Sequence, residues 1–413
     1  MEVSMQQLVV LAYSGGLDTS CILVWLREQG YSVIAYLANL GQNEDFEEAR
    51  AKAEKLGAVD VIIEDLRREL VEDFAFVSVQ GNCRYEDKYL LGTSLARPCI
   101  VRGLVRAARK HKAGFIAHGA TGKGNDQVRF EFGCAALMPN AKVIAPWRDP
   151  GFCARFQGRQ DLFSYARANG IPLPVTPKSP WSIDGNIIHV SYESGILEDP
   201  NCPAPEGLCQ MTVDPEKAPD KPQLLTINFE KGIPVSVVME DGSRVEGSLE
   251  VFTAVNTAAA AHGVGRVDMV ENRFLGLKSR GVYETPGLTA LHAAHGDLES
   301  VCLDKRVRDV KEHLAHVLAQ QIYNGLWYSP ECEYTRQCIA ASQTHVTGSV
   351  RLKLYKGNVH VVQRVGAPGC SLYNTSLVSM DEHGGYDPTD ASGFIAVHAL
   401  RLREYGSLRA AAP

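Results

Sequence analysis

The first third of the chain alternates short apolar runs with segments of helical periodicity, and this order limits the fold more than any other feature of the sequence. Strands that alternate with helices form βαβ units, which build a parallel sheet covered by helices on both faces. We therefore predict an α/β fold with a parallel sheet near the N-terminus. The predicted strands and helices, in chain order, are 8–13, 17–29, 32–38, 43–56, 59–64, 96–112 and 114–118.

A proline-rich segment at 171–180 separates this region from the rest of the chain. It holds four prolines in ten residues, which excludes a regular helix or a central strand. Beyond it, apolar and polar residues alternate at 225–229 and 350–354, and Gly357-Asn358 is placed to turn the second of these strands back. This pattern predicts a second domain of antiparallel α+β type.

The end of the chain has apolar residues at helical spacing, namely Ile395, Ala399, Leu402 and Tyr405. A helix of this kind buries its apolar face, either on its own domain or on a neighbouring subunit. We expect three parts, with boundaries at 1–170 for the parallel-sheet domain, 181–385 for the second domain and 386–413 for a C-terminal helical tail.

The net charge limits the classes of molecule that the chain is expected to bind, and the cysteine content indicates the cellular compartment. The formal net charge is −6, so the chain lacks the overall basic footprint of a nucleic-acid-binding protein. Its 11 cysteines include no CxxC pair, which favours free thiols in a reducing compartment over a disulfide framework or a zinc ribbon. We find no signal-peptide pattern, and no apolar run reaches the ~20 residues that span a bilayer. We expect a cytosolic protein that binds neither nucleic acid nor membrane.

The segment Ala12–Ser20 carries the strongest local signal for a ligand. Two adjacent glycines let backbone N–H groups turn toward one point, and the helix that starts at Leu17 directs its positive end there. This arrangement suits a phosphate group. Asp18 fits such an anion site if Mg²⁺ is present, because magnesium binds through carboxylate and phosphate oxygens. The plainer alternative is an ordinary Gly-Gly turn.

A second glycine-rich loop, 118–127, follows a later predicted strand. In an open parallel sheet, ligands bind beyond the carboxyl ends of the strands, where both loops would emerge. Lys123 adds a positive charge for phosphate, while Thr121, Asn125 and Asp126 offer polar groups for an amino-acid ligand. Alone the loop could be a simple surface loop, but the pair of loops indicates one binding site.

The motifs resemble a known family. SGGLDTS, with neither a Walker A nor a GxGxxG pattern nearby, resembles the pyrophosphate-gripping loop of the ATP pyrophosphatase (PP-loop) superfamily, whose fold is adenine nucleotide alpha hydrolase-like. Further blocks resemble the argininosuccinate synthase family and run in order across nearly the whole chain. They are AYSGGLDTS, YLLGTSLARP (89–98), HGATGKGNDQVRFE (118–131), APW (145–147), SYESGILE (191–198) and GVGRVDMVENRFLGLKSRGVYETP (263–286).

The resemblance implies roles for individual residues. The implied ATP-binding residues are Ala12, Tyr13, Ser14, Gly15, Gly16, Leu17, Asp18, Thr19, Ser20, Ala38, Ala117, His118, Gly119, Ala120, Thr121, Gly122, Lys123, Gly124 and Asn125. The implied citrulline-binding residues are Tyr89, Ser94, Asn125, Arg129, Ser182, Ser191, Glu271 and Tyr283, and those for aspartate are Thr121, Asn125 and Asp126. Arg129 suits the carboxylate of citrulline and Glu271 its ammonium group.

The resemblance also implies a reaction, namely ATP-dependent ligation of citrulline to aspartate through a citrullyl-adenylate. We expect ATP and Mg²⁺ to take part, backbone amides of 14–17 and Lys123 to neutralise the leaving pyrophosphate, and Asp18 to set metal or phosphate geometry. The family implies a homotetramer and a role in arginine biosynthesis or the urea cycle. The segments 201–219 and 292–300 match the family less well.

Two other functions remain open at this point. One is another PP-loop enzyme, such as a tRNA-modifying thiolase or an amidotransferase-coupled synthetase. The absence of CxxC, the net charge of −6 and the lack of a cysteine after Met1 weigh against these. The other is a nucleotide-binding regulatory protein without catalysis, which binding of ATP without pyrophosphate release would favour.

Two histidine pairs and a basic cluster have plainer explanations. His292/His295 and His313/His316 are spaced i, i+3, but zinc needs a third and usually a fourth ligand. We therefore expect surface or hydrogen-bonded histidines and no metal site made of them. The basic residues of 102–112 follow one helical face, which we expect to be solvated rather than bound to nucleic acid.

Overall fold

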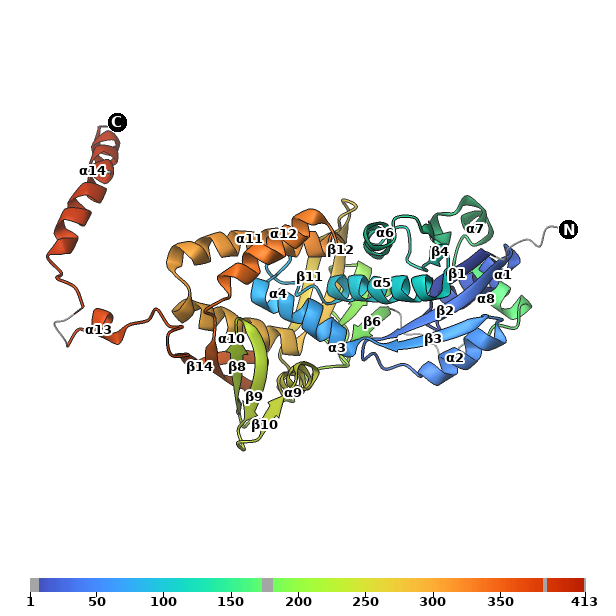
Figure 1. The fold of residues 1–413 in the computed structure, drawn as a ribbon, viewed down its shortest axis with the longest axis horizontal. Helices are drawn as coiled ribbons and strands as arrows, with labels where there is room; N and C mark the ends of the chain where they lie inside the picture. The colour runs from blue at the N-terminus through green and yellow to red at the C-terminus, as the bar shows by residue number, and fades with distance from the viewer. Residues whose placement is uncertain (1–6, 173–180, 382–384, 412–413) are drawn as a thin grey trace. The chain divides into compact units, whose positions relative to one another are not determined.

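The computed structural model describes residues 7–172, 181–381 and 385–411. The chain forms two compact units, Met1–Cys370 and Ser371–Pro413. The predicted boundary at 171–180 lies outside the described residues from 173 onward. The first unit contains three sheets, one parallel and two antiparallel (Figure 1).

The strands and helices predicted for the N-terminal region occur in the expected order, and the structure adds further elements between and after them. All the elements of this region, in chain order, are β1 (Gln7–Ala12), α1 (Leu17–Glu28), β2 (Tyr31–Asn39), α2 (Phe46–Lys55), β3 (Asp60–Asp65), α3 (Arg67–Leu70), a π-helical turn (Val71–Ala75), α4 (Phe76–Gly81), α5 (Gly92–His111), β4 (Phe115–Ala117), α6 (Asp126–Leu137), β5 (Lys142–Ile144), a 3₁₀ turn (Pro146–Arg148), α7 (Pro150–Arg155) and α8 (Arg159–Ala168).

Antiparallel sheets and helices make up the remainder. The elements are β6 (Ser182–Asn186), β7 (His189–Glu193), a 3₁₀ turn (Gly195–Glu198), β8 (Gln223–Glu230), β9 (Ile233–Met239), β10 (Arg244–Glu246), α9 (Ser248–Ala261), β11 (Arg266–Asn272), β12 (Lys278–Glu284), α10 (Pro286–Cys302), α11 (Lys305–Tyr323), α12 (Pro330–Ser342), β13 (Gly348–Tyr355), β14 (Asn358–Gly366), α13 (Thr375–Val378) and α14 (Asp390–Ala410).

The parallel sheet has the strand order β3-β2-β1-β4-β5. Its side chains alternate between two helical layers, since Val9 and Leu11 of β1 pack with α1 and α8, whereas Val10 packs with α5 and α6. Burial on both faces explains why these strands are continuous apolar runs. The predicted α/β fold is confirmed, as is the parallel sheet covered on both faces.

Several predicted boundaries shift by a few residues. The helix expected from 43 begins at Phe46, because the side chain of Asp45 accepts hydrogen bonds from the N–H groups of Glu47 and Glu48 and caps the helix. The hairpin turn expected at Gly357-Asn358 is wrong by one residue. It consists of Lys356 and Gly357, which have φ of 42° and 83°, and this pair of positive values is the geometry of a two-residue hairpin loop.

The basic cluster of α5 is ion-paired rather than simply solvated. Arg102 donates to Glu69 and, at 2.6 Å, to Asp73, while Arg106 donates to Glu64 at 2.8 Å. These contacts tie α5 to the segment that follows β3. Arg106 is 42% exposed, as expected of a solvated face, whereas Arg102 is 29% exposed and partly buried by its two ion pairs.

A buried polar network joins the helices of the second half. The Glu299 carboxylate accepts hydrogen bonds from Asn82 Nδ2 and Gln343 Nε2, both at 2.7 Å, and forms an ion pair with Lys311 Nζ at 2.7 Å. Glu299 and Lys311 are each only 2% exposed. Burial alone would raise the pKa of Glu299, but His295 and Lys311 lower it below its usual range. The network links α10 and α11 to the residues that directly follow α4 and α12.

The histidine pair of α10 is buried rather than on the surface. His295 hydrogen-bonds to Asn82 and Gln343 at 2.9 and 2.8 Å, so it is satisfied as expected, whereas neither ring nitrogen of His292 has a hydrogen-bond partner among the described residues. Within these residues no group of three or more His, Cys, Asp or Glu side chains could hold a metal ion.

The second compact unit contains α13 and α14, and the predicted C-terminal helix is confirmed. The large apolar side chains of α14 are exposed. They belong to Phe394, Ile395, Val397, Leu400, Leu402, Tyr405 and Leu408. Across the described ranges of the chain, no helix is both long enough and apolar enough to cross a membrane.

Candidate active site

The two glycine-rich loops lie side by side at the carboxyl edge of the parallel sheet. They follow β1 and β4, which are neighbours with Leu11 opposite Ala117. The chain leaves β1 for β2 on one side of the sheet and returns to β4 on the other. Ligands of open α/β sheets bind at such a switch point. The predicted meeting of the loops is confirmed.

Local contacts define the shape of the first loop, residues 12–20. Gly15 has φ +70°, and a Cβ there would lie 3.0 Å from the Cβ of Ala49, so only glycine fits without strain. The hydroxyls of Ser14 and Thr19 lie 3.1 Å apart, and Lys52 Nζ donates to the Gly15 carbonyl at 2.9 Å. The loop therefore presents hydroxyl groups and the start of α1 on one side, a combination that attracts anions.

Two cavities of about 690 and 680 Å³ open beside the loops. We call them cavity 1, which extends over the first loop and the end of β2, and cavity 2, which extends over the second loop and the strands β7, β11 and β12. They share a border of five residues, which are Arg97, Gly119, Ala120, Asp126 and Asp184. Cavities of this size each accommodate a small-molecule ligand.

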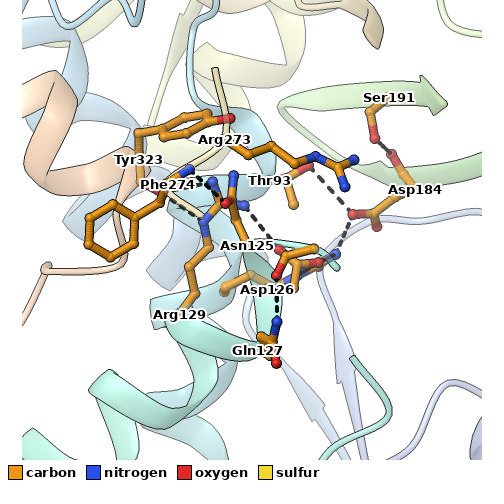
Figure 2. Close-up of polar contacts among 12 residues, drawn as sticks. Thr93, Asn125, Asp126, Gln127, Arg129, Asp184, Ser191, Arg273, Phe274 and Tyr323 are labelled. Carbon is orange, nitrogen blue, oxygen red and sulfur yellow. Dashed lines mark hydrogen bonds and ion pairs between the residues drawn. The ribbon is translucent and has the colours of Figure 1, made fainter. Parts of the chain in front are cut away.

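Charged groups alternate along the border between the cavities. Arg97 Nε and Arg129 Nη1 donate to the two carboxylate oxygens of Asp126, both at 2.9 Å, and Arg97 also pairs with Asp184. Figure 2 shows Arg129, Asp126 and Asp184 turned toward one another from α6 and β6. Burial alone would raise the pKa of Asp126, but the two arginines lower it to about 2. Asp126 is therefore ionised at neutral pH.

Arg129 connects the site to the second half of the chain. Its Nε and Nη2 donate to the carbonyl oxygen of Tyr323 at 3.1 and 2.9 Å, and its side chain is 5% exposed (Figure 2). A Cβ at Gly325 would lie 2.9 Å from the Cα of Arg129, so the turn after α11 presses directly on α6. The guanidinium is thereby fixed at the wall of cavity 2.

The wall of cavity 2 opposite Asp126 is aromatic and acidic. The rings of Tyr89 and Tyr283 stack with centroids 4.5 Å apart, and the Glu271 side chain is 7% exposed beside them. Burial raises the pKa of Glu271 above its usual range, although nearby hydroxyls and arginines oppose this. A buried carboxylate and a buried guanidinium in one cavity suit a ligand that carries both an ammonium and a carboxylate group.

The tip of the β11–β12 hairpin holds the second loop in place. The Phe274 N–H donates to Asn125 Oδ1 at 3.1 Å (Figure 2). Arg273 donates to the Lys123 carbonyl at 3.1 Å and to the Glu193 carboxylate at 2.8 Å. These three hydrogen bonds therefore connect the second loop to the β11–β12 hairpin and to β7.

Comparisons with known proteins identify the family. A model described as "Arginosuccinate synthase N-terminal HUP domain" matches residues 8–172, and one described as "Arginosuccinate synthase C-terminal domain" matches residues 181–405. The chain belongs to the argininosuccinate synthase family. It is 58% identical over 406 residues to "Argininosuccinate synthase" of Danio rerio, with 98% of each chain covered. It is 58% identical over 402 residues to that of Homo sapiens, with 97% of each covered. The resemblance stated from the motifs is confirmed.

Most residues implied by the argininosuccinate synthase resemblance line one of the cavities. Cavity 1 is lined by Ala12, Tyr13, Ser14, Thr19 and Ala38, and both cavities by Gly119, Ala120 and Asp126. Cavity 2 is lined by Tyr89, Thr121, Lys123, Gly124, Asn125, Arg129, Ser182, Ser191, Glu271 and Tyr283. Neither lining includes Gly15, Gly16, Leu17, Asp18, Ser20, Ser94, Ala117, His118 or Gly122.

Sequence reasoning missed several polar residues of this site, chiefly Arg97, Asp184, Glu193 and Arg273. Arg97 lies inside the block 89–98 that carries the family resemblance, and it follows the implied citrulline-binding residue Ser94 by three positions. Its proximity to the site could therefore have been inferred. Nothing in the local sequence of Asp184 or Glu193 signals a partner arginine. Their pairing depends on how β6 and β7 pack against α5 and β11.

Proposed function

We propose that the chain is a C–N-bond-forming ligase that joins citrulline to aspartate, with ATP as the third substrate. The observation that supports this most is the pair of cavities that meet at Arg97, Asp126 and Asp184 beside an anion-binding loop, in a chain of the argininosuccinate synthase family. Cavity 1 and the second glycine-rich loop bind ATP, and cavity 2 binds the two amino acids.

The first half of the reaction transfers AMP to citrulline. The ureido oxygen of citrulline forms a bond to the α-phosphorus of ATP, and the bond from that phosphorus to the bridging oxygen breaks. Pyrophosphate leaves with the electron pair. Glu271 binds the ammonium group of citrulline and Arg129 its carboxylate, so the ureido group is directed toward the border with cavity 1. The first loop and Lys123 provide donors for the leaving pyrophosphate.

The second half forms the carbon–nitrogen bond. The amine of aspartate, after losing a proton from its ammonium form, attacks the ureido carbon of the citrullyl-adenylate, and AMP leaves with the carbon–oxygen bond electrons. Thr121, Asn125 and Asp126 position the aspartate. Asp126 does not take up the proton, because its two arginines hold its pKa at about 2. Its part is to orient the substrate and the arginines.

Pyrophosphate release with each substrate combination tests this function. The intact protein is mixed with ATP and Mg²⁺, and citrulline and aspartate are added singly and together. We expect sustained release only with both amino acids, together with equal amounts of AMP and argininosuccinate. Release that needs a different acceptor would replace the substrates in this proposal, and ATP binding without release would favour a regulatory protein.

Magnesium is the one inorganic partner that this function requires. The Asp18 carboxylate lies half-buried in the first turn of α1 and forms no hydrogen bond or ion pair with any residue that the structure describes, so it is available as a ligand. Magnesium held by Asp18 and phosphate oxygens would supply positive charge to the departing pyrophosphate.

Asp18→Ala is expected to abolish adenylation and leave the fold intact. We expect citrulline-dependent exchange of pyrophosphate into ATP to fall by at least about 10²-fold, because a charge contact to the leaving group is lost. Asp390→Ala, which removes the acidic residue from the first turn of α14, is the matched control. A folded Asp18→Ala protein with near-normal exchange would contradict the role.

The raised pKa of Glu271 predicts a pH dependence of citrulline binding. Only the ionised carboxylate pairs with the ammonium, so KM for citrulline is expected to rise as pH falls through a pKa above the usual range of glutamate. Glu271→Gln should raise KM by about 10–100-fold and remove this dependence, as expected for one charge-assisted hydrogen bond. The exposed Glu230, replaced by glutamine, serves as the control. A pH dependence that survives in Glu271→Gln would contradict the assignment.

Arg273→Gln tests the hairpin that holds the second loop. The variant loses the contacts to Lys123 and Glu193, so the loop that binds aspartate loses its support. We expect KM for aspartate to rise by about tenfold, the worth of roughly one hydrogen bond to a charged group, while citrulline-dependent pyrophosphate exchange changes little. Arg244→Gln, which removes an exposed pair outside both cavities, is the control. Equal losses in both assays would argue against a selective effect on aspartate.

The family also supports a homotetramer, a cytosolic location and a role in arginine biosynthesis or the urea cycle. The exposed apolar side chains of α14 are suited to contact a neighbouring subunit. All 11 cysteines are unpaired, which supports a reducing compartment.

A further inference from the structure

Arg97 is the positively charged residue at the border between the two cavities. Of the five residues that border both cavities, it alone carries a positive charge. Among the described residues that line cavity 1, no other lysine or arginine occurs, and Lys123 lines cavity 2 only. The single cation of the nucleotide cavity therefore lies where that cavity meets the amino-acid cavity.

The reacting atoms of the proposed adenylation lie at the same border. ATP in cavity 1 and citrulline in cavity 2 react only if the α-phosphorus and the ureido oxygen meet where the cavities join. Negative charge on the non-bridging oxygens of the α-phosphate must be neutralised as the ureido oxygen approaches. A fixed cation at this point lowers the barrier more than one that has to move into place.

The contacts of Arg97 leave part of its guanidinium free. Nε and Nη2 face Asp126 at 2.9 and 2.8 Å, and Nη2 also pairs with Asp184. Nη1 forms no hydrogen bond or ion pair with a described residue, so its two N–H groups remain for a ligand. The two carboxylates hold the Nε–Nη2 edge of the guanidinium from two different elements, since Asp126 belongs to α6 and Asp184 to β6.

We propose that Arg97 is a catalytic residue that binds a non-bridging oxygen of the α-phosphate through Nη1 and stabilises the transition state of adenylation. The proposal rests on the proposed function, because it needs citrulline and ATP in the two cavities. It gives Asp126 and Asp184 a common task, which is to orient this guanidinium.

Pyrophosphate exchange into ATP, dependent on citrulline, measures this step in the intact protein. Arg97→Gln is expected to lower the exchange rate by about 10²–10³-fold, the usual loss when one preorganised donor to a transition state is removed. Binding of an ATP analogue with a methylene bridge between the α and β phosphorus should change by only a few fold. Arg102→Gln is the matched control, because Arg102 lies on the same helix and also pairs with two carboxylates, but lines neither cavity.

A stereochemical measurement separates direct contact from positioning. ATP with sulfur in place of one non-bridging α-phosphate oxygen exists as two diastereomers, and sulfur accepts hydrogen bonds poorly. We expect the wild-type protein to prefer one diastereomer in the exchange assay, and Arg97→Gln to reduce that preference by at least about tenfold. Arg97→Lys, which keeps the charge but loses the planar fork, should restore only part of the rate.

The outcomes distinguish the two proposals. No citrulline-dependent exchange by the wild-type protein would contradict the proposed function itself. Normal exchange by the wild type with an unchanged rate in Arg97→Gln would overturn the role of Arg97 alone. So would a slower Arg97→Gln protein whose diastereomer preference is unchanged, since that result is the mark of an indirect structural effect. Equal use of both diastereomers by the wild-type protein would also count against the contact.

Discussion

Asp126→Asn is expected to lower kcat/KM of the overall ligation by about 10³-fold. The substitution removes the negative charge that accepts hydrogen bonds from both Arg97 and Arg129, and each charge-assisted bond of this kind contributes roughly 1.5–3 kcal/mol. Both guanidinium groups lose their orientation, so citrulline binding and adenylation are both impaired. Steady-state kinetics with each amino acid varied in turn measures the loss.

The control for this prediction is an aspartate that pairs with an arginine elsewhere. Asp73→Asn weakens the contact to Arg102, which lies outside both cavities, and should leave the kinetics near wild type. Circular dichroism establishes that both variants fold. An Asp126→Asn protein that is folded and loses less than tenfold in kcat/KM would show that the arginines keep their geometry without it.

Glu299→Gln is expected to lower the free energy of unfolding by about 3–5 kcal/mol, the usual cost of breaking a buried ion pair. Three donors, from Asn82, Gln343 and Lys311, converge on the Glu299 carboxylate. A glutamine amide presents its own N–H₂ group to one of them and leaves the Lys311 ammonium without a counter-charge. Denaturant titration followed by circular dichroism measures the change.

Glu312→Gln provides the comparison on a neighbouring helix. Glu312 pairs with Arg308 at 3.2 Å, but its side chain is 64% exposed, so its loss should leave the unfolding midpoint unchanged within error. If the two variants behave alike, the buried network contributes little to stability, and burial of Glu299 is not what makes its contacts strong.

The architecture of the N-terminal half follows closely from sequence periodicity. Continuous apolar runs predict the strands of the parallel sheet, and the Gly-Gly pair after the first run predicts the anion-binding turn between β1 and α1. These elements were predictable because they depend on local propensity and on the order of strands along the chain. Helix starts were less predictable. The start of α2 at Phe46 depends on the Asp45 cap, and α5 begins earlier than expected, at Gly92, because Leu91 adopts a left-handed conformation.

The binding residues were predictable where they lie on the loops and blocks that define the family, such as Thr121, Arg129 and Glu271. The ion pairs between them were not. Asp184 meets Arg97 only because the β6–β7 hairpin packs on α5, and Arg129 meets Tyr323 only because α11 ends beside α6. Contacts between segments 87 and 194 residues apart leave no periodic pattern in a single sequence.

The carbonyl of Tyr323 that holds Arg129 has a consequence for synthesis of the chain. A ribosome makes the parallel sheet and both glycine-rich loops long before it reaches this residue, so a nascent chain can complete the nucleotide loops while the amino-acid cavity is still missing a wall. ATP that enters such an intermediate meets no correctly held citrulline. Because Tyr323 lies in the C-terminal part of the chain, the wall of the amino-acid cavity is complete only once the end of α11 has packed against α6.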